Sequence, residues 1–265
     1  MMKIKGFDCN TKLSYETAVK FKSDGWEYAI RYVGRYTMNP KIDIDKTEKD
    51  NIITAGLGLM LVQHCPGKDG IHPSKELGQH WGENAREFSK EVEYEQDCIL
   101  YVDLENVNPA YKDKQPLIYD YVNYWTEEVY KYYTPGVYNG WNSYLNAEEL
   151  YYKLKLKHYW GAFNAQHDVA VRGYEMKQAT GGTKFGIQID INYMTGDKLG
   201  GIPPFMHGKT FQNEALLDKA LDWVEKVKIT NSPEHWKQQT LTVKNLEGLI
   251  LNMGNYIERK ETNNG

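Results

Sequence analysis

The chain has 265 residues, of which 41% are hydrophobic and 26% charged, a balance typical of a folded globular protein rather than a disordered one. Its net charge of -4, with no dominant basic patch, argues against a nucleic-acid partner. The 21 Tyr and 7 Trp residues are numerous, and their flat faces with polar edges suit the rings of a carbohydrate. Core packing explains most of these rings equally well, so the composition permits a glycan partner without demonstrating one.

The N-terminus and the hydropathy pattern bear on where the chain acts. A strand-like run at residues 3–8 begins almost at once and ends in an acid, so no secretory signal peptide is recognisable. No run of about 18 apolar residues occurs, so no membrane span is expected. The sequence therefore predicts synthesis in the cytoplasm without a signal peptide, and any action at the cell wall would follow export or lysis.

The cysteines and histidines form no recognisable disulfide or ligand pattern. The cysteines are odd in number and lack CxxC spacing, which predicts free buried thiols at Cys9, Cys65 and Cys98. Three histidines follow one another at intervals of eight in a loop that contains Gly and Pro, a spacing that matches no common metal motif: His64, His72 and His80. The sequence therefore predicts no metal site.

Short apolar runs alternate with amphipathic stretches, a pattern typical of βαβ units. In chain order, the first half is predicted to contain a strand at 3–8, a helix at 15–23, a strand at 27–33, a helix at 45–55, a strand at 58–63, a helix at 81–93 and a strand at 98–104. The second half adds a helix at 117–132, a strand at 136–139, a helix capped by Asn146, and strands at 158–163, 175–179 and 186–190.

These elements amount to about eight strands and five helices, and the later strands are joined by loops too short for full helices. A closed TIM-like (β/α) barrel with incomplete later helices fits this α/β pattern better than an open doubly wound sheet. No GxGxxG or GxxxxGK[ST] motif follows a strand, so no nucleotide cofactor is expected. No GxSxG motif supports a serine hydrolase.

The stretch Ile202-Pro203-Pro204 marks the predicted end of the barrel. Residues 1–204 are therefore assigned to the barrel and residues 205–265 to a small helical appendage, with helical patterns at 213–227, from Ser232-Pro233 onwards, and at 243–257. Such a segment is too short to build a large independent core. Packing against the barrel and a role in wall targeting or subunit contact both remain open.

Four acids fall near predicted strand ends, where the active sites of α/β barrels lie. Asp103 and Glu105 are two positions apart on one strand, so their side chains point to the same face, with Cα atoms roughly 6.6 Å apart at a rise of about 3.3 Å per residue. Asp8 ends the first predicted strand and Asp190 the last, and these strands become neighbours if the sheet closes. Closure therefore predicts one cluster of four carboxylates from three distant parts of the chain.

Clustered carboxylates repel one another, and burial raises the pKa of at least one of them. Such a group can stay protonated near neutral pH and serve as a general acid. Cleavage of a glycosidic bond needs that proton on the leaving oxygen, and negative charge or a nucleophile beside the developing oxocarbenium ion. The alternative for any one of these acids is a structural role as a helix cap or a salt-bridge partner.

Five short segments occur in the order found in a known family. They are Gly6-Phe7-Asp8, Arg31-Tyr32-Val33-Gly34-Arg35-Tyr36, Tyr101-Val102-Asp103-Leu104-Glu105, Gly136-Val137-Tyr138 and Ile189-Asp190-Ile191-Asn192. On these segments the chain resembles the glycoside-hydrolase-like barrel family formerly described as a domain of unknown function, a relative of the Chalaropsis-type family 25 lysozymes. The resemblance implies muramidase-type action on the β-1,4 bond of peptidoglycan or a related amino-sugar polymer.

Carried over by position, the resemblance implies that Glu105 is the general acid. Asp103 and Asp190 would orient or stabilise the acetamido group of the substrate or supply the nucleophile, and Asp8 would shape the electrostatics of the site. A direct carboxylate nucleophile and an acetamido-assisted route both remain open. Aromatic residues near predicted strand ends are candidates for a sugar-binding platform: Tyr32, Tyr138, Trp141, Trp160 and Tyr193.

Two other hypotheses compete with the muramidase. A non-catalytic glycan-binding barrel would bind peptidoglycan or chitin fragments without releasing new reducing ends. An interaction or toxin-delivery module would dock through the residues beyond Pro204. The loop Gln63-His64-Cys65-Pro66, and the insertion that extends from it to Trp81, have no counterpart in the family pattern.

Overall fold

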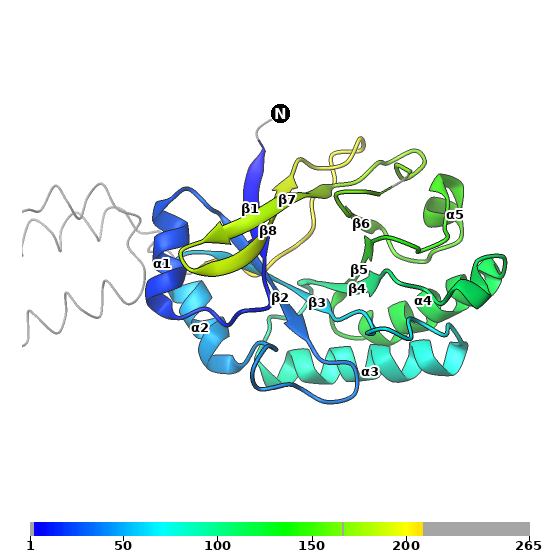
Figure 1. The fold of residues 1–265 in the computed structure, drawn as a ribbon, viewed down its shortest axis with the longest axis horizontal. Helices are drawn as coiled ribbons and strands as arrows, with labels where there is room; N and C mark the ends of the chain where they lie inside the picture. Colours follow the sequence, from blue (N-terminus) through cyan, green and yellow to red (C-terminus); the bar gives the residue numbers. More distant parts are fainter. Residues whose placement is uncertain (1–2, 166, 209–265) are drawn as a thin grey trace, which may run out of the picture.

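The strands of the protein close into a barrel with helices packed around its outside (Figure 1). The computed structural model describes residues 3–165 and 167–208. Its elements are, in chain order, β1 (Ile4–Asp8), α1 (Tyr15–Ser23), β2 (Tyr28–Val33), α2 (Lys46–Thr54), β3 (Gly58–Gln63), α3 (Lys75–Glu91), β4 (Ile99–Leu104), the 3-10 turn η1 (Pro109–Tyr111), α4 (Gln115–Val129), β5 (Thr134–Asn139), α5 (Ala147–Tyr152), β6 (His158–Gly161), β7 (Met176–Lys184) and β8 (Ile187–Met194). The predicted α/β barrel with incomplete later helices is confirmed.

The last two strands depart from the repeating strand–helix pattern. Strands β1 to β7 pair in parallel with their neighbours along the barrel. In contrast, β7 and β8 form an antiparallel hairpin, and β8 closes the barrel antiparallel to β1. Phe185 and Gly186 join the hairpin with φ values of 49° and 84°, as in the tight turns that connect antiparallel strands. A connection this short leaves no room for a helix and reverses the direction of β8.

Side chains of the strands alternate between two hydrophobic cores, one on each face of the sheet. One core fills the barrel interior and includes Tyr101 and Trp160. The other lies between the sheet and the helices and includes Val102 and Trp125. Because the interior is filled with side chains, a ligand can approach the ends of the barrel but cannot pass through it.

Helix packing decides where α3 begins. The helix starts at Lys75 rather than at the predicted residue 81, and Ser74 caps it. A glycine in its first turns, Gly78, weakens the helical pattern in the sequence but lets α3 approach α4 closely, since a Cβ there would lie 2.2 Å from the carbonyl oxygen of Tyr121. Asn146 caps α5 as predicted, through a complete capping box.

The segment after β8 returns to the amino ends of the strands. Met206 and Leu59 exchange two backbone hydrogen bonds of 2.7 and 3.1 Å, and the N–H of Ile99 donates to the carbonyl oxygen of Pro204 over 2.6 Å. The chain thus still contacts the barrel beyond residue 204. The appendage helices predicted at 213–227 and 243–257 lie outside the described residues, so the division into 1–204 and 205–265 stays a prediction. Within the described ranges, no helix is long and apolar enough to cross a membrane.

Candidate active site

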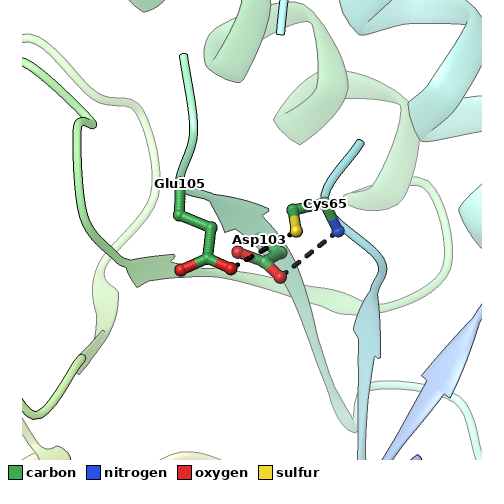
Figure 2. A group of neighbouring side chains, drawn as sticks. All are labelled: Cys65, Asp103 and Glu105. Atoms are coloured by element: carbon green, nitrogen blue, oxygen red, sulfur yellow. Dashed lines mark hydrogen bonds between the residues drawn. The ribbon is translucent and has the colours of Figure 1, made fainter. Parts of the chain in front are cut away.

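The carboxyl end of β4 supplies two acids that point into the mouth of the barrel (Figure 2). Asp103 lies in β4 and Glu105 directly follows the strand, so both share the inner face with Tyr101. Asp103 is only 7% exposed, whereas Glu105 is half-buried and lies nearer to solvent. One carboxylate oxygen of each lies within 4.8 Å of the other. The predicted placement of these two acids on one face is confirmed.

Cys65 bridges the two acids from the loop that follows β3 (Figure 2). Its backbone N–H donates to Oδ2 of Asp103 over 3.2 Å, and its thiol donates to Oε1 of Glu105 over 3.3 Å. Burial, followed by the charges of the two carboxylates, raises the pKa of the Cys65 thiol far above its usual value. The thiol is therefore neutral and acts as a hydrogen-bond donor to Glu105.

The same three residues are close enough to share a cation. Sγ of Cys65 and one oxygen each of Asp103 and Glu105 lie within 4.8 Å of one another. A mixed sulfur and oxygen donor set suits Zn²⁺ better than Ca²⁺ or Mg²⁺, which prefer oxygen alone. The sequence did not reveal this group, because its members come from the ends of two different strands and match no local ligand spacing.

Asp8, at the end of β1, is the second buried acid of the mouth. It is 3% exposed and accepts three hydrogen bonds: from the hydroxyl of Tyr32 over 2.9 Å, from Nε2 of Gln178 over 3.0 Å and from Nδ2 of Asn192 over 2.7 Å. Burial raises the pKa of Asp8 to about 6, although these hydrogen bonds oppose the shift. The carboxyl of Asp8 therefore keeps its proton to higher pH than an ordinary aspartate does.

A second set of hydrogen bonds holds the partners of Asp8 in place. Nε1 of Trp160 donates to Oδ1 of Asn192 over 2.9 Å, and the hydroxyl of Tyr138 donates to Oε1 of Gln178 over 2.9 Å. Each amide therefore has its carbonyl oxygen occupied and its NH2 group directed at the carboxylate. This arrangement ties Asp8 to β5, β6, β7 and β8.

Asp190 lies at the mouth of the barrel, but its position in the last strand differs from the predicted one. The predicted neighbourhood of the first and last strands is confirmed, but the prediction that Asp190 ends the last strand is wrong, because β8 runs antiparallel to β1 and continues to Met194. Asp190 instead lies within β8 as the direct register partner of Asp8. The Asp190 residue is exposed, yet the partial burial of its carboxyl raises its pKa. The negative charge of Asp190 also contributes to the raised pKa of Asp8. The antiparallel register brings it beside Asp8 all the same.

The five aromatic candidates occupy four different environments. Tyr32 and Tyr138 lie at the mouth with their hydroxyls in the network around Asp8, and Trp141 is 57% exposed in the loop after β5. Trp160 is 1% exposed, so its ring offers no surface to a sugar, contrary to the prediction. Tyr193 was predicted to lie near the sugar-binding end of a strand, and this is wrong. The antiparallel β8 pairs Tyr193 with Lys5, near the start of β1 and away from the acids.

The sequence pattern predicted no role in the site for Cys65 or Gln178, and Asn192 appeared only within the segment Ile189-Asp190-Ile191-Asn192. For Asn192 a signal exists, since it is two positions from Asp190 on a strand and must share its face. Cys65 lies just beyond a predicted strand end, the place where barrel active sites form. Gln178 carries no comparable local signal, because its position depends on how β7 pairs with its neighbours.

Replacing Asp103 by asparagine is expected to raise the free energy of unfolding at pH 7 by on the order of 1 kcal/mol. An asparagine keeps an acceptor for the N–H of Cys65. It also removes the ionisable carboxyl, whose charged form is destabilised by burial and whose Oδ1 accepts no hydrogen bond from the described residues. Equilibrium denaturation of the variant and the wild type, analysed for the free energy of unfolding, measures the difference.

The pH dependence of this gain has a defined sign. Burial, and then the charge of Glu105, raise the pKa of Asp103 well above the usual range, so the folded wild type binds more protons than the unfolded chain. The contribution of Asp103 to the stability therefore falls as the pH rises above about 4, the ordinary aspartate pKa. The advantage of Asp103→Asn should be present at pH 7 and shrink towards about pH 4. An advantage that grows as the pH falls would contradict this account.

A closed barrel with helices outside and buried carboxylates at its mouth is a glycoside hydrolase-like architecture. The sequence match agrees with the architecture. The chain belongs to the Rv2525c-like, glycoside hydrolase-like domain family, whose model matches residues 19–194. This confirms the resemblance inferred from the short segments. Comparison with curated proteins finds no match.

Solved structures with TM-scores above 0.5 show the same fold at low sequence identity. The Tat-secreted protein Rv2525c of Mycobacterium tuberculosis, in complex with L-tartrate, is similar with a TM-score of 0.54 and 16% identity over 74% of this chain and 98% of that one. An uncharacterized protein of B. stearothermophilus has a TM-score of 0.53 and 13% identity over 72% and 96%. A family GH25 lysozyme of Aspergillus fumigatus has a TM-score of 0.48 and 16% identity over 75% and 96%.

Proposed function

We propose that the chain is a glycoside hydrolase that cleaves the β-1,4 linkage of peptidoglycan or a related amino-sugar polymer. The observation that carries the proposal is the pair of acids at the end of β4, one buried and one nearer to solvent, with oxygens within 4.8 Å. Membership of a glycoside hydrolase-like family supports the reaction class. A cell-wall polymer as substrate implies that the protein acts after export or lysis.

Glu105 is the proposed general acid. Burial raises its pKa, with the hydrogen bond from Cys65 acting in the opposite direction, so the protonated form persists to higher pH than for an ordinary glutamate. Its partial exposure lets it reach the oxygen of the leaving sugar, to which it donates its proton as the bond breaks. Asp103 is too deeply buried for that contact and would act on the developing positive charge.

The spacing of the two acids favours retention over inversion of configuration at the anomeric carbon. Inverting enzymes place their carboxyl groups roughly 6.5–9.5 Å apart to accommodate a water molecule, whereas retaining enzymes place them about 5–5.5 Å apart. Oxygens of Asp103 and Glu105 within 4.8 Å support the retaining class, with either a carboxylate or the acetamido oxygen of the substrate as nucleophile. Asp190 and Asp8 add negative charge on the opposite side of the mouth.

Release of reducing ends from purified peptidoglycan tests the proposal. The wild type is expected to generate new reducing ends, and borohydride reduction of the products before acid hydrolysis identifies the sugar at each new end. Reduced muramic acid would indicate a muramidase, and reduced glucosamine would indicate cleavage of the other linkage. No new reducing ends from peptidoglycan or chitin oligomers would refute the hydrolase.

Gly140→Ala is expected to lower the rate of cleavage by up to about 10²-fold while the fold is retained. A Cβ at this position would lie 2.4 Å from Cβ of Glu105 and 2.5 Å from its Oε2, so Glu105 must move. Gly182→Ala is the matched control, since its added Cβ would meet nothing within 4 Å. Initial rates and far-UV circular dichroism of both variants provide the measurement. Equal rates would show that the position of Glu105 is unimportant.

A non-catalytic glycan-binding barrel is the second candidate. The observation that favours it is Trp141, 57% exposed at the rim of a polar pocket in the loop after β5. An exposed indole beside polar groups can stack against a sugar ring without any chemistry at the acids. Saturable binding of peptidoglycan fragments with no release of reducing ends would support this alternative.

A further inference from the structure

A polar pocket lies beside the acids at the carboxyl ends of β5 and β6. Its volume is about 410 Å³, within the range of roughly 300–1,000 Å³ typical of small-molecule sites. The loop 140–146 forms one wall, Asn164 in the loop after β6 lies in another, and Asn139 of β5 also lines the pocket. Trp141 stands at its rim with 57% of its surface exposed.

Amide groups with unused hydrogen-bonding capacity face this pocket. Within the described parts of the chain, the side chains of Asn142 and Asn164 make no hydrogen bond, and Oδ1 of the 3% exposed Asn139 accepts none. Each asparagine amide offers both a donor and an acceptor. A ligand amide, with an N–H donor at one end and a C=O acceptor at the other, is a complementary partner that can bridge two such groups. Sugar hydroxyls also donate and accept hydrogen bonds, so a sugar without amides is the necessary comparison.

The pocket is held in register with Glu105. The N–H of Gly140 donates to the carbonyl of Leu104 over 3.1 Å, the N–H of Asn106 to the carbonyl of Trp141 over 2.8 Å, and the N–H of Val107 to the carbonyl of Asn142 over 3.2 Å. These bonds extend the pairing of β4 and β5 past both strand ends, on either side of Glu105. Asn142 itself has a φ of 58°, a left-handed conformation that asparagine tolerates better than most residues.

We infer that this pocket is a subsite for an amide group carried by the polymer, either the acetamido group of an amino sugar or the peptide attached to it. Trp141 stacks against the sugar that bears the amide, and Asn142 and Asn164 pair with the amide itself. The inference rests on the proposed function in taking an amino-sugar polymer as the ligand. It adds that substrate choice is made beside Glu105, by a pocket that does not take part in the chemistry.

Three probes separate the alternatives, titrated calorimetrically into Glu105→Gln so that no cleavage intervenes. N-acetylglucosamine tetramer carries acetamido groups only, cellotetraose has the same β-1,4 backbone without amides, and a disaccharide–peptide fragment of peptidoglycan carries both kinds of amide. The N-acetylated tetramer or the disaccharide–peptide is expected to bind at least about tenfold more tightly than cellotetraose, a difference of about 1.4 kcal/mol.

Two variants in the same background localise the preference. Asn142→Gly removes the amide while keeping a backbone that tolerates a φ of 58°, and Trp141→Ala removes the indole. Asn142→Gly is expected to abolish the tenfold preference, and Trp141→Ala is expected to weaken the binding of all three probes. Tyr130→Ala, which removes a 72% exposed ring outside the pocket, should change neither. A preference shown by the tetramer assigns the subsite to the acetamido group, and one shown by the disaccharide–peptide alone assigns it to the peptide.

These experiments can reject the amide subsite and the hydrolase activity independently of each other. Equal binding of all three probes, or a preference that survives Asn142→Gly, overturns the subsite whether or not the wild type cleaves peptidoglycan. An amide preference that depends on Asn142, in a protein whose wild type releases no reducing ends, retains the subsite and rejects the hydrolase.

Discussion

Glu105→Gln is expected to lower the rate of reducing-end release from peptidoglycan by about 10²–10⁴-fold, the range associated with loss of a general acid. Glutamine preserves the shape of the side chain and an oxygen that accepts the hydrogen bond from the thiol of Cys65. It has no ionisable proton to donate to the leaving oxygen. Binding of the polymer should change little, because the proton is required only as the bond breaks.

Glu148→Gln provides the matched control for this experiment. Glu148 is an exposed acid in the first turn of α5, so its replacement removes one charge without touching the mouth of the barrel. Initial rates, polymer binding and thermal unfolding of both variants should be compared with those of the wild type. Full activity of Glu105→Gln would reject Glu105 as the acid, and equal loss in both variants would indicate a general effect of charge.

Arg31→Leu is expected to lower the free energy of unfolding by about 3–5 kcal/mol. Arg31 is fully buried, and its Nε donates to Oε1 of Glu48 over 2.6 Å. The guanidinium also donates to the backbone carbonyl oxygens of Cys9 and Ile42. Its removal leaves the 2% exposed Glu48 as an uncompensated buried charge and leaves the two carbonyls without this donor. Urea denaturation at pH 7 measures the loss.

A double variant separates the broken ion pair from lost packing. Arg31→Leu combined with Glu48→Leu removes both charges, so it is expected to be more stable than Arg31→Leu alone. Lys46→Met is the surface control, because Lys46 and its partner Glu93 are both more than half exposed and the pair should contribute little. If Arg31→Leu proves as stable as Lys46→Met, the buried pair is not an important source of stability.

The buried pair also fixes a wall of the candidate site. Arg31 precedes Tyr32, which donates to Asp8, and its bond to Ile42 anchors the loop that carries Asp43. Asp43 in turn pairs with Nε2 of His64 over 2.8 Å, and the His64 ring stacks on Tyr32 at 4.5 Å between centroids. A loss of stability at Arg31 would therefore be accompanied by looser positioning of Tyr32 at the mouth.

Local patterns in the sequence were enough to predict the strands and helices, and to place Asp103 and Glu105 together in the site. Alternating apolar and amphipathic segments predicted the strands and helices, because period and burial are properties of neighbouring residues. The same periodicity placed Asp103 and Glu105 on one face of β4, as the structure confirms. It failed at the start of α3, where close packing of Gly78 against α4 outweighs the low helical propensity of glycine.

The sequence by itself therefore determined the α/β barrel, the cap of α5 at Asn146 and the placement of Asp103 and Glu105 on one face. Only the tertiary structure decided which groups meet at the mouth: the thiol of Cys65 against Glu105, and the amides of Gln178 and Asn192 against Asp8. The tight turn at Phe185 and Gly186 reverses β8 locally, whereas the register of β8 against β1 is set by closure of the whole sheet. The physical reason is that closure joins residues far apart in the chain and fixes the burial that shifts the pKa of Asp8, and no short segment encodes either.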